Sequence, residues 1–381
     1  MPAKKNRIAI VTIISSLEAF PSLMNAIRLL AGSGYQVDVI GRRSPQWKIP
    51  KFEHLNVNLI MSPWSTRVGG IPGLAALRHL LLIMYQCIFF RPQAVFAISP
   101  EALVLVAPIA ILLRIPLVHY SLEIRYARNW ISWLQKQAEK FYYHFVRFTI
   151  IQDEIRGWAL LDSNNMKKAE MIYVPNSTSL SKPNGMKSDY LRRYQNIPCD
   201  NVIILSAGCM NPTTLTYELA KDAQTWPINW TLVLHGWVED QDYLDDLRTL
   251  CDGKRIILST EFLSFDQVNE LVSSADIGVA LYKATDPNVL NMSRSSGKIW
   301  QYLFCGLPVV TVDFPTLQQM VDEGKFGLCI ARVEDIRPAI VQILADYAGF
   351  ASQAQDFYRR NGDFSTSFKP VLERLASLTA G

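Results

Sequence analysis

A serine pair followed by glycine and lysine is the segment of this 381-residue chain whose residue types most clearly suggest chemistry. Ser295 and Ser296 can cap a helix that begins near Gly297, and Gly306 with Pro308 can end it. A helix N-terminus offers free backbone N–H groups and the positive end of the helix dipole, and a glycine there lets an anion approach the backbone. The spacing therefore predicts a binding site for a diphosphate.

Two cations accompany the start of this predicted helix. Lys298 would lie in the first turn, where a positive charge opposes the helix dipole, so it is better placed as a phosphate ligand than as a helix former. Arg294, just upstream, could add a bidentate contact. The alternative is an ordinary capped helix whose basic residues are solvated.

The segments that must position this helix alternate between apolar runs of strand length and helix-like stretches. This alternation is typical of parallel strands joined by crossover helices. In the first half, strands are expected at 8–14, 37–40, 57–60, 95–98, 117–120, 148–151 and 172–174. In the second half, they are expected at 202–206, 231–235, 255–258, 277–281, 309–312 and 328–330. We therefore expect an α/β fold with two doubly wound Rossmann-like domains that face a shared cleft.

The expected domain boundaries follow from a cluster of turn-forming residues after Val174. We expect an N-terminal domain at 1–180, a linker at 181–200 and a C-terminal domain at 201–350. Residues 351–381 are expected to be helices that pack back on the N-terminal domain. Residues 102–113 are predicted to be a core helix, because a membrane span needs roughly 18 to 20 apolar residues.

The cysteines and the distribution of charge indicate which cellular compartment and which partners suit this chain. The six cysteines include no Cys-x-x-Cys pair, and no His lies at metal-ligand spacing, so we expect no metal and a reducing, cytoplasmic compartment. Residues 1–180 hold 20 Lys and Arg against 10 Asp and Glu, whereas residues 181–381 hold 18 against 24. The basic half suits an anionic membrane surface or a phosphate-bearing acceptor, and a surface bias without function is the alternative.

Longer stretches around the serine pair resemble a known family. Residues 275–282 read Ala-Asp-Ile-Gly-Val-Ala-Leu-Tyr, and residues 295–310 read Ser-Ser-Gly-Lys-Ile-x-x-Tyr-Leu-x-Cys-Gly-Leu-Pro-Val-Val. Together they resemble the donor half of GT-B glycosyltransferases, in particular the retaining glycosyltransferase family 4 group. The turns that end in Gly208 and Gly236 resemble the glycine turns after the first two strands of that domain. The resemblance covers most of residues 8–330 and is strongest in the second half.

This resemblance implies a metal-independent glycosyltransferase that moves a sugar from a nucleotide-diphosphate donor to an acceptor hydroxyl, with retention. Residues 1–180 would bind a saccharide or lipid-linked acceptor, residues 201–350 would bind the donor as co-substrate, and no further cofactor or nucleic acid is implied. The expected location is the cytoplasm, at the inner face of a membrane. The donor-binding residues implied are Gly208, Gly236, Arg294, Ser295, Ser296, Gly297, Lys298 and Gln301.

Several positions depart from the family's pattern. Gln301 matches the acidic residue that holds the ribose, and an amide can bond a diol only without charge assistance. Ser293 stands where the first acid of the family's paired-glutamate motif would lie, and the turn at 209–214 lacks the usual Arg and Lys. A catalytically silent nucleotide-binding partner subunit is therefore one alternative function, and a sugar-nucleotide epimerase is another.

Three residues are candidates for catalysis: Glu123, His119 and Lys298. The segment 117–123 resembles a strand end that carries an acidic residue in relatives, so Glu123 is the acceptor-side candidate; a loop carboxylate paired with Arg125 or Arg128 is the alternative. His119 lies inside the apolar strand, where the alternative is a hydrogen-bonded core histidine. The aromatic stretch at 130–145 is expected to be core, with acceptor or lipid contact as the alternative.

Overall fold

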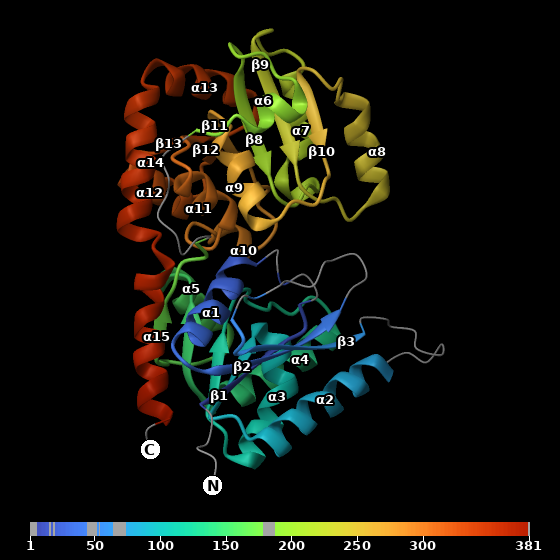
Figure 1. Ribbon diagram of the computed structural model, residues 1–381, viewed down its shortest axis with the longest axis vertical. Helices are drawn as coiled ribbons and strands as arrows, with labels where there is room; N and C mark the ends of the chain where they lie inside the picture. The colour runs from blue at the N-terminus through green and yellow to red at the C-terminus, as the bar shows by residue number, and fades with distance from the viewer. Residues whose placement is uncertain are drawn as a thin grey trace. The chain divides into compact units, whose positions relative to one another are not determined.

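The computed structural model describes residues 6–14, 17, 20–43, 52, 54–63, 74–177 and 187–379. The chain divides into two compact units, Met1–Asn176 with Phe364–Gly381 and Ser177–Asp363 (Figure 1). The boundaries differ from the expected ones. Residues 187–200 were expected in a linker but belong to the second unit, because Leu191 and Ile197 are buried in its core. Residues 181–186 lie outside the described residues, and of the C-terminal helices only 364–381 belong to the first unit.

The first unit is built on a seven-stranded sheet with the order β3-β2-β1-β4-β5-β6-β7, in which every pair is parallel. The strands are β1 (Arg7–Thr12), β2 (Gln36–Arg43), β3 (Val57–Pro63), β4 (Ala94–Ile98), β5 (Leu117–Tyr120), β6 (Val146–Ile151) and β7 (Met171–Tyr173). All five residues of the central strand β4 are buried, as expected for a parallel sheet covered on both faces. Each apolar run predicted as a strand in this half overlaps one of these strands.

Helices cover both faces of this sheet (Figure 1). The helices are α1 (Pro21–Gly32), α2 (Leu74–Phe90), α3 (Ser99–Leu113), α4 (Trp130–Tyr143), α5 (Glu154–Ser163) and α15 (Phe364–Thr379). The connection through α1 runs toward one edge of the sheet, and those through α2 to α5 run toward the other. Because such crossovers are right-handed, α2 to α5 share the face opposite α1. Helix α15 packs against α1 and β7, and its Arg374 forms a two-bond ion pair with Glu170 (2.6 and 2.9 Å).

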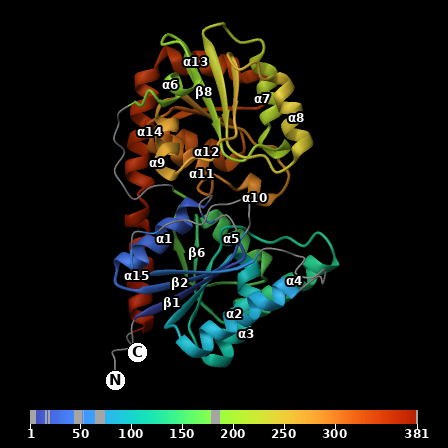
Figure 2. The same cartoon turned by 45° about the vertical axis from the view of Figure 1, so that its right-hand side comes forward.

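The second unit has a six-stranded parallel sheet with the order β10-β9-β8-β11-β12-β13 (Figure 2). Its strands are β8 (Val202–Ala207), β9 (Trp230–His235), β10 (Ile256–Ser259), β11 (Ile277–Ala280), β12 (Val309–Val312) and β13 (Gly327–Ile330). The chain leaves β8 toward β9 and later returns to β11 on the other side of β8. This reversal is the topological switch point, where open α/β sheets bind ligands at the carboxyl ends of their strands.

The helices of the second unit are α6 (Tyr190–Gln195), α7 (Thr216–Ala223), α8 (Gln241–Leu250), α9 (Phe265–Ser273), α10 (Pro287–Leu290), α11 (Gly297–Phe304), α12 (Pro315–Gly324), α13 (Ile336–Ala345) and α14 (Tyr347–Asn361). Most of them connect its strands, whereas α6 precedes the first strand and α13 and α14 follow the last. The predicted α/β fold with two doubly wound parallel sheets is confirmed. Among the described residues, no helix combines the length and apolar character needed to cross a membrane.

Candidate functional site

The predicted helix after the serine pair is α11, and it begins and ends where the sequence indicates. Ser296 is its N-cap, because the Ser296 hydroxyl accepts a hydrogen bond from the Ile299 amide at 3.3 Å. The same hydroxyl shares a hydrogen bond of 2.8 Å with the hydroxyl of Tyr282. Gly306 follows the helix with a φ of +72°, the left-handed conformation that ends many helices.

Tyr302 links α11 to the sheet through two hydrogen bonds of its hydroxyl. The Tyr302 hydroxyl accepts a hydrogen bond from the Ala207 amide at 2.8 Å and donates one to the Val279 carbonyl at 3.2 Å, so it joins the ends of β8 and β11. Gly278 in β11 makes room for this ring, because a Cβ there would lie 2.4 Å from the nearest Tyr302 atom. The N-terminal turn of α11 is thereby held at the switch point of the sheet.

Two glycines bring the main chain into close contact where β8 and β9 end. Gly208 has a φ of +103° and Gly236 a φ of +149°. A Cβ on Gly236 would lie 1.9 Å from the carbonyl oxygen of Gly208, so only glycine fits at that position. The Gly208 amide donates to the His235 carbonyl at 2.8 Å, which extends the pairing of the two strands into the turn.

Lys298 completes this corner. A Cβ on Gly208 would lie 3.4 Å from Cε of Lys298, and Nζ of Lys298 lies 5.6 Å from the centre of the Tyr282 ring. Burial lowers the pKa of Lys298 to about 8, an effect that the neighbouring Cys209 partly opposes. The amides of Gly297 and Lys298 are the first two of α11 and have no acceptor inside the helix. A largely protonated lysine and free amide groups therefore converge beside the glycine turn, an arrangement suited to an anion.

Arg294 has a different set of neighbours from Lys298. Its Nη2 atom lies 3.1 Å from Oε2 of Glu323, and its guanidinium carbon lies 5.8 and 5.4 Å from the ring centres of Trp300 and Phe357. The Trp300 indole N–H donates to the Arg294 carbonyl at 3.0 Å. A phosphate contact by Arg294 would therefore require it to exchange Glu323 for the ligand.

Gln301 lies three residues after Lys298, on the same side of α11. Its Nε2 atom donates to Oδ1 of Asn269 in α9 at 3.4 Å. Ser295 lies in the turn before the helix, where its amide donates to the Met292 carbonyl at 3.1 Å. The positions implied for donor binding on α11 and the two glycine turns thus gather at one end of the second sheet, with Arg294 turned toward Glu323.

The structure adds two residues to this corner that the sequence analysis did not assign. Tyr282 contacts both the N-cap serine and the Lys298 ammonium group. His235 immediately precedes Gly236; its Nδ1 atom lies 3.0 Å from Oγ of Ser259, and burial lowers the pKa of His235 to about 4, which keeps it neutral. Both residues directly follow or end a predicted strand, and that placement was the available signal.

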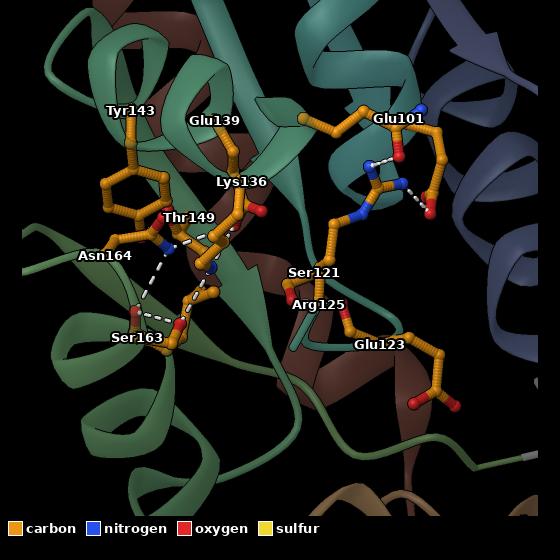
Figure 3. A network of polar contacts seen from close by, with 12 residues as sticks. Glu101, Ser121, Glu123, Arg125, Lys136, Glu139, Tyr143, Thr149, Ser163 and Asn164 are labelled. Carbon is orange, nitrogen blue, oxygen red and sulfur yellow. Dashed lines mark hydrogen bonds and ion pairs between the residues drawn. The ribbon is translucent and has the colours of Figure 1, made fainter. Parts of the chain in front are cut away.

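Glu123 follows β5 in the first unit, and its side chain is 67% exposed (Figure 3). Its Oε2 atom lies 3.8 Å from Nη2 of Arg156, a fully buried guanidinium that also donates to the Leu122 carbonyl at 2.9 Å. Arg125, one of the expected alternative partners of Glu123, pairs with Glu101 instead. Glu123 is therefore an accessible carboxylate held beside a buried cation.

His119 is fully buried in β5, between Ala97 of β4 and Thr149 of β6. Its ring meets the Tyr143 ring edge-on, with 5.9 Å between the centres. Burial lowers the pKa of His119 to about 3, so the imidazole is neutral near pH 7. Any influence of His119 on a ligand would have to pass through the residues around it.

An Asp-x-Asp sequence is present at Asp240 and Asp242, where it has a structural role. Oδ1 of Asp240 caps α8 by accepting the amides of Asp242 and Tyr243 at 3.0 and 3.5 Å. Within the residues that the structure describes, no three or more His, Cys, Asp and Glu side chains are grouped so as to hold a metal ion.

Comparison with known proteins assigns the region that contains α11. Residues 210–346 match the family model described as "Glycosyl transferases group 1". The similarity to this family is shown for that region of the chain. The matched region includes Gly236 and all the site residues of α11, whereas Gly208 lies just before it.

Solved structures extend the similarity to the whole fold. The chain has a TM-score of 0.74 to Anabaena HepE in complex with UDP and glucose, at 18% identity and with 97% of this chain and 99% of that one covered. It has a TM-score of 0.65 to a putative UDP-N-acetylglucosamine 2-epimerase from Listeria monocytogenes, at 12% identity and with 99% and 98% covered. The predicted GT-B fold is therefore confirmed, and this fold is shared by a protein solved with UDP and glucose and by a putative epimerase.

A curated relative is similar over a shorter stretch. UDP-glycosyltransferase TURAN from Arabidopsis thaliana is 22% identical over 134 residues, which are 35% of this chain and 28% of the relative. The chain thus matches less than a third of the length of that protein.

Proposed function

We propose that this chain is a glycosyltransferase that moves a sugar from a nucleotide-diphosphate donor to an acceptor hydroxyl. The observation that carries the proposal is the meeting of Gly208, Gly236 and Lys298 at the N-terminus of α11. The match of residues 210–346 to a glycosyltransferase family supports it. Because TURAN is named as a UDP-glycosyltransferase and HepE was solved with UDP, UDP is the first nucleotide to test.

The departing diphosphate would gain negative charge as the bond from the sugar to the phosphate breaks. Lys298 and the first amides of α11 would stabilise that charge without reorganising. Arg294 would join them after releasing Glu323, and the Gln301 amide would bond the ribose hydroxyls. These roles require no metal ion or further cofactor.

On the acceptor side, Glu123 is the proposed catalytic carboxylate, because it is accessible and negatively charged at neutral pH. His119 would act only by positioning its neighbours. The acceptor would be a saccharide or a lipid-linked sugar, presented at the cytoplasmic face of a membrane. Retention of the anomeric configuration is part of the proposal and can be read from the NMR coupling constant of the product.

A silent nucleotide-binding subunit is the second candidate function. It is motivated by Gln301 and by the turn after Gly208, where Asn211 caps a short 3-10 helix (Pro212–Thr214) and no Arg or Lys is present. Such a subunit would bind UDP but neither hydrolyse nor transfer sugar from a UDP-sugar. Donor hydrolysis or transfer by the purified chain would eliminate it. Release of an epimerised nucleotide sugar would instead support the third alternative, an epimerase.

The direct test is isothermal titration of the full chain with UDP, using Lys298→Ala and the matched control Lys254→Ala. Lys254 is an exposed lysine of the same unit, in the loop before β10. We expect the Lys298 variant to lose on the order of tenfold or more in affinity, the value of one charge-assisted contact. The control should bind as the unmodified chain does. Equal binding by both variants would show that α11 is not the diphosphate site.

A further inference from the structure

Helix α4 has the reverse of the usual amphipathic arrangement. Its side toward the rest of the first unit carries Lys136, Glu139 and Tyr143, which are buried. Its outward side carries large apolar residues. They are Trp130, Ile131, Trp133, Leu134 and Phe141, with Trp130 72% exposed. The prediction that this aromatic stretch is core is therefore wrong for Trp130, Trp133 and Phe141 and holds for Tyr143, because the helical period reveals a stripe but not which side is buried.

The polar side of α4 is satisfied where it is, so the helix cannot turn over to hide its apolar side. Nζ of Lys136 lies 3.0 Å from Oε1 of Glu139 and 3.0 Å from Oγ of Ser163 in α5 (Figure 3). Nδ2 of Asn164 donates to the same Glu139 oxygen at 3.0 Å. Turning α4 over would bring its apolar side chains against the polar groups of Ser163 and Asn164, which would lose these partners inside the protein, and this is unfavourable.

Helix α2 presents a second apolar stripe to its surroundings. Of its side chains whose burial the structure describes (77–90), those of His79, Ile83 and Cys87 are buried, along one narrow side. Its exposed large apolar residues are Leu77, Leu81, Met84, Tyr85, Ile88, Phe89 and Phe90. A surface helix of a globular protein normally carries polar residues on its outer side, and α2 contains no acidic residue at all.

The two stripes belong to one layer. Helix α3 packs against both α2 and α4 on the same face of the sheet, and its end adds Leu112, which is 82% exposed (Figure 2). We call the outer surface of these three helices the α2–α4 face. Large exposed apolar side chains gathered on neighbouring helices indicate an interaction surface.

The charges around the α2–α4 face are mainly positive. Residues 74–147 contain eight Lys and Arg and three Asp and Glu. Each of those three acids lies near a cation: Glu139 is buried against Lys136, Glu101 pairs with Arg125, and Glu123 lies 3.8 Å from Arg156. Exposed basic residues include Arg78 on α2 and Arg147 after α4. An apolar surface with aromatic residues and a positive border matches the region between the headgroups and acyl chains of an anionic bilayer.

From these features we propose that the α2–α4 face inserts shallowly into an anionic lipid membrane, with α2 and α4 in the plane of the interface. The apolar side chains enter the headgroup region, and the basic residues contact lipid phosphates. This inference rests on the first unit alone and does not depend on the proposed transferase activity.

Vesicle co-sedimentation of the full chain tests the proposal. We expect binding to phosphatidylcholine vesicles that contain phosphatidylglycerol, weaker binding to phosphatidylcholine alone, and loss of binding as salt rises. The double variant Phe89→Ser with Trp133→Ser should reduce binding by on the order of tenfold or more, because it removes two exposed aromatic groups that would be buried in the bilayer. The matched control is Ile228→Ser, an exposed apolar residue of the second unit, which should bind normally.

A charge test separates the two contributions. Arg78→Gln and Arg147→Gln should each weaken binding roughly fivefold and reduce its salt dependence. Absence of vesicle binding, or equal binding by the double variant, would overturn the proposal. So would a dimer, seen by light scattering, that the double variant abolishes, because the α2–α4 face would then join two copies of the chain. UDP titration of the same samples distinguishes these results from a failure of the nucleotide site.

Discussion

Replacing Lys298 by methionine should stabilise the folded protein while weakening nucleotide binding. Methionine keeps the apolar part of the side chain and removes the charge. Burial lowers the pKa of Lys298 from 10.5 to about 8, so the folded state binds this proton less tightly than the unfolded state does. A difference of about 2.5 units corresponds to about 3 kcal/mol, and partial contact with solvent reduces this to about 1–3 kcal/mol.

The sign of the pH dependence follows from linkage. A lysine whose pKa is lowered by folding destabilises the folded state at every pH below about 8, and this effect fades as pH rises toward 10.5. At pH 7 the Lys298→Met variant should therefore melt higher than the unmodified chain, by roughly 2–4 °C for each kcal/mol. The difference should shrink between pH 8 and pH 10.5.

Thermal unfolding at several pH values, with and without UDP, measures both effects. The control Lys254→Met changes an exposed lysine and should stay within about 0.5 kcal/mol of the unmodified chain at every pH. With saturating UDP the order should reverse, because the ligand stabilises only the protein that binds it. A Lys298→Met variant that melts at or below the unmodified chain at pH 7 without UDP would refute the reasoning. A constant gain up to pH 10.5 would refute it as well.

Three further substitutions test other parts of the structure. Gly236→Ala should destabilise the second unit by about 1–3 kcal/mol or more, measured by urea unfolding, because its Cβ would overlap the Gly208 carbonyl; an unchanged midpoint would contradict the described turn. Ser296→Ala should cost about 1 kcal/mol through loss of the helix cap, together with weaker UDP binding, and intact affinity would separate the cap from the site. Glu139→Gln should cost about 3–5 kcal/mol by leaving Lys136 without its buried partner; a much smaller loss by urea unfolding would indicate that water reaches this network.

Much of the fold could be predicted from the sequence, because parallel strands and the helices that cover them have clear local patterns of apolar residues. The fully buried strands appear as short apolar runs, and each predicted run overlaps an observed strand. The ends of α11 could also be predicted, since the residues that signal them, Ser296 and Gly306, lie next to the helix in the sequence. Local chemistry thus determined where the candidate anion site would be.

The features that sequence reasoning missed depend on contacts between distant residues. The pairing of Arg294 with Glu323 joins positions 29 residues apart, and no local sequence pattern predicts it. The burial of the charged side of α4 depends on Ser163 and Asn164 of another helix.

The contact between Gly236 and Gly208 also bears on how this site can vary among related proteins. The contact is made by main-chain atoms of both residues, and a Cβ on Gly236 would lie 1.9 Å from the Gly208 carbonyl oxygen. Changing a side chain therefore cannot reshape this contact, because no side chain takes part in it. New donor preferences would have to arise from substitutions at surrounding positions, such as Arg294 and Gln301. The two glycines are expected to stay the same in such proteins.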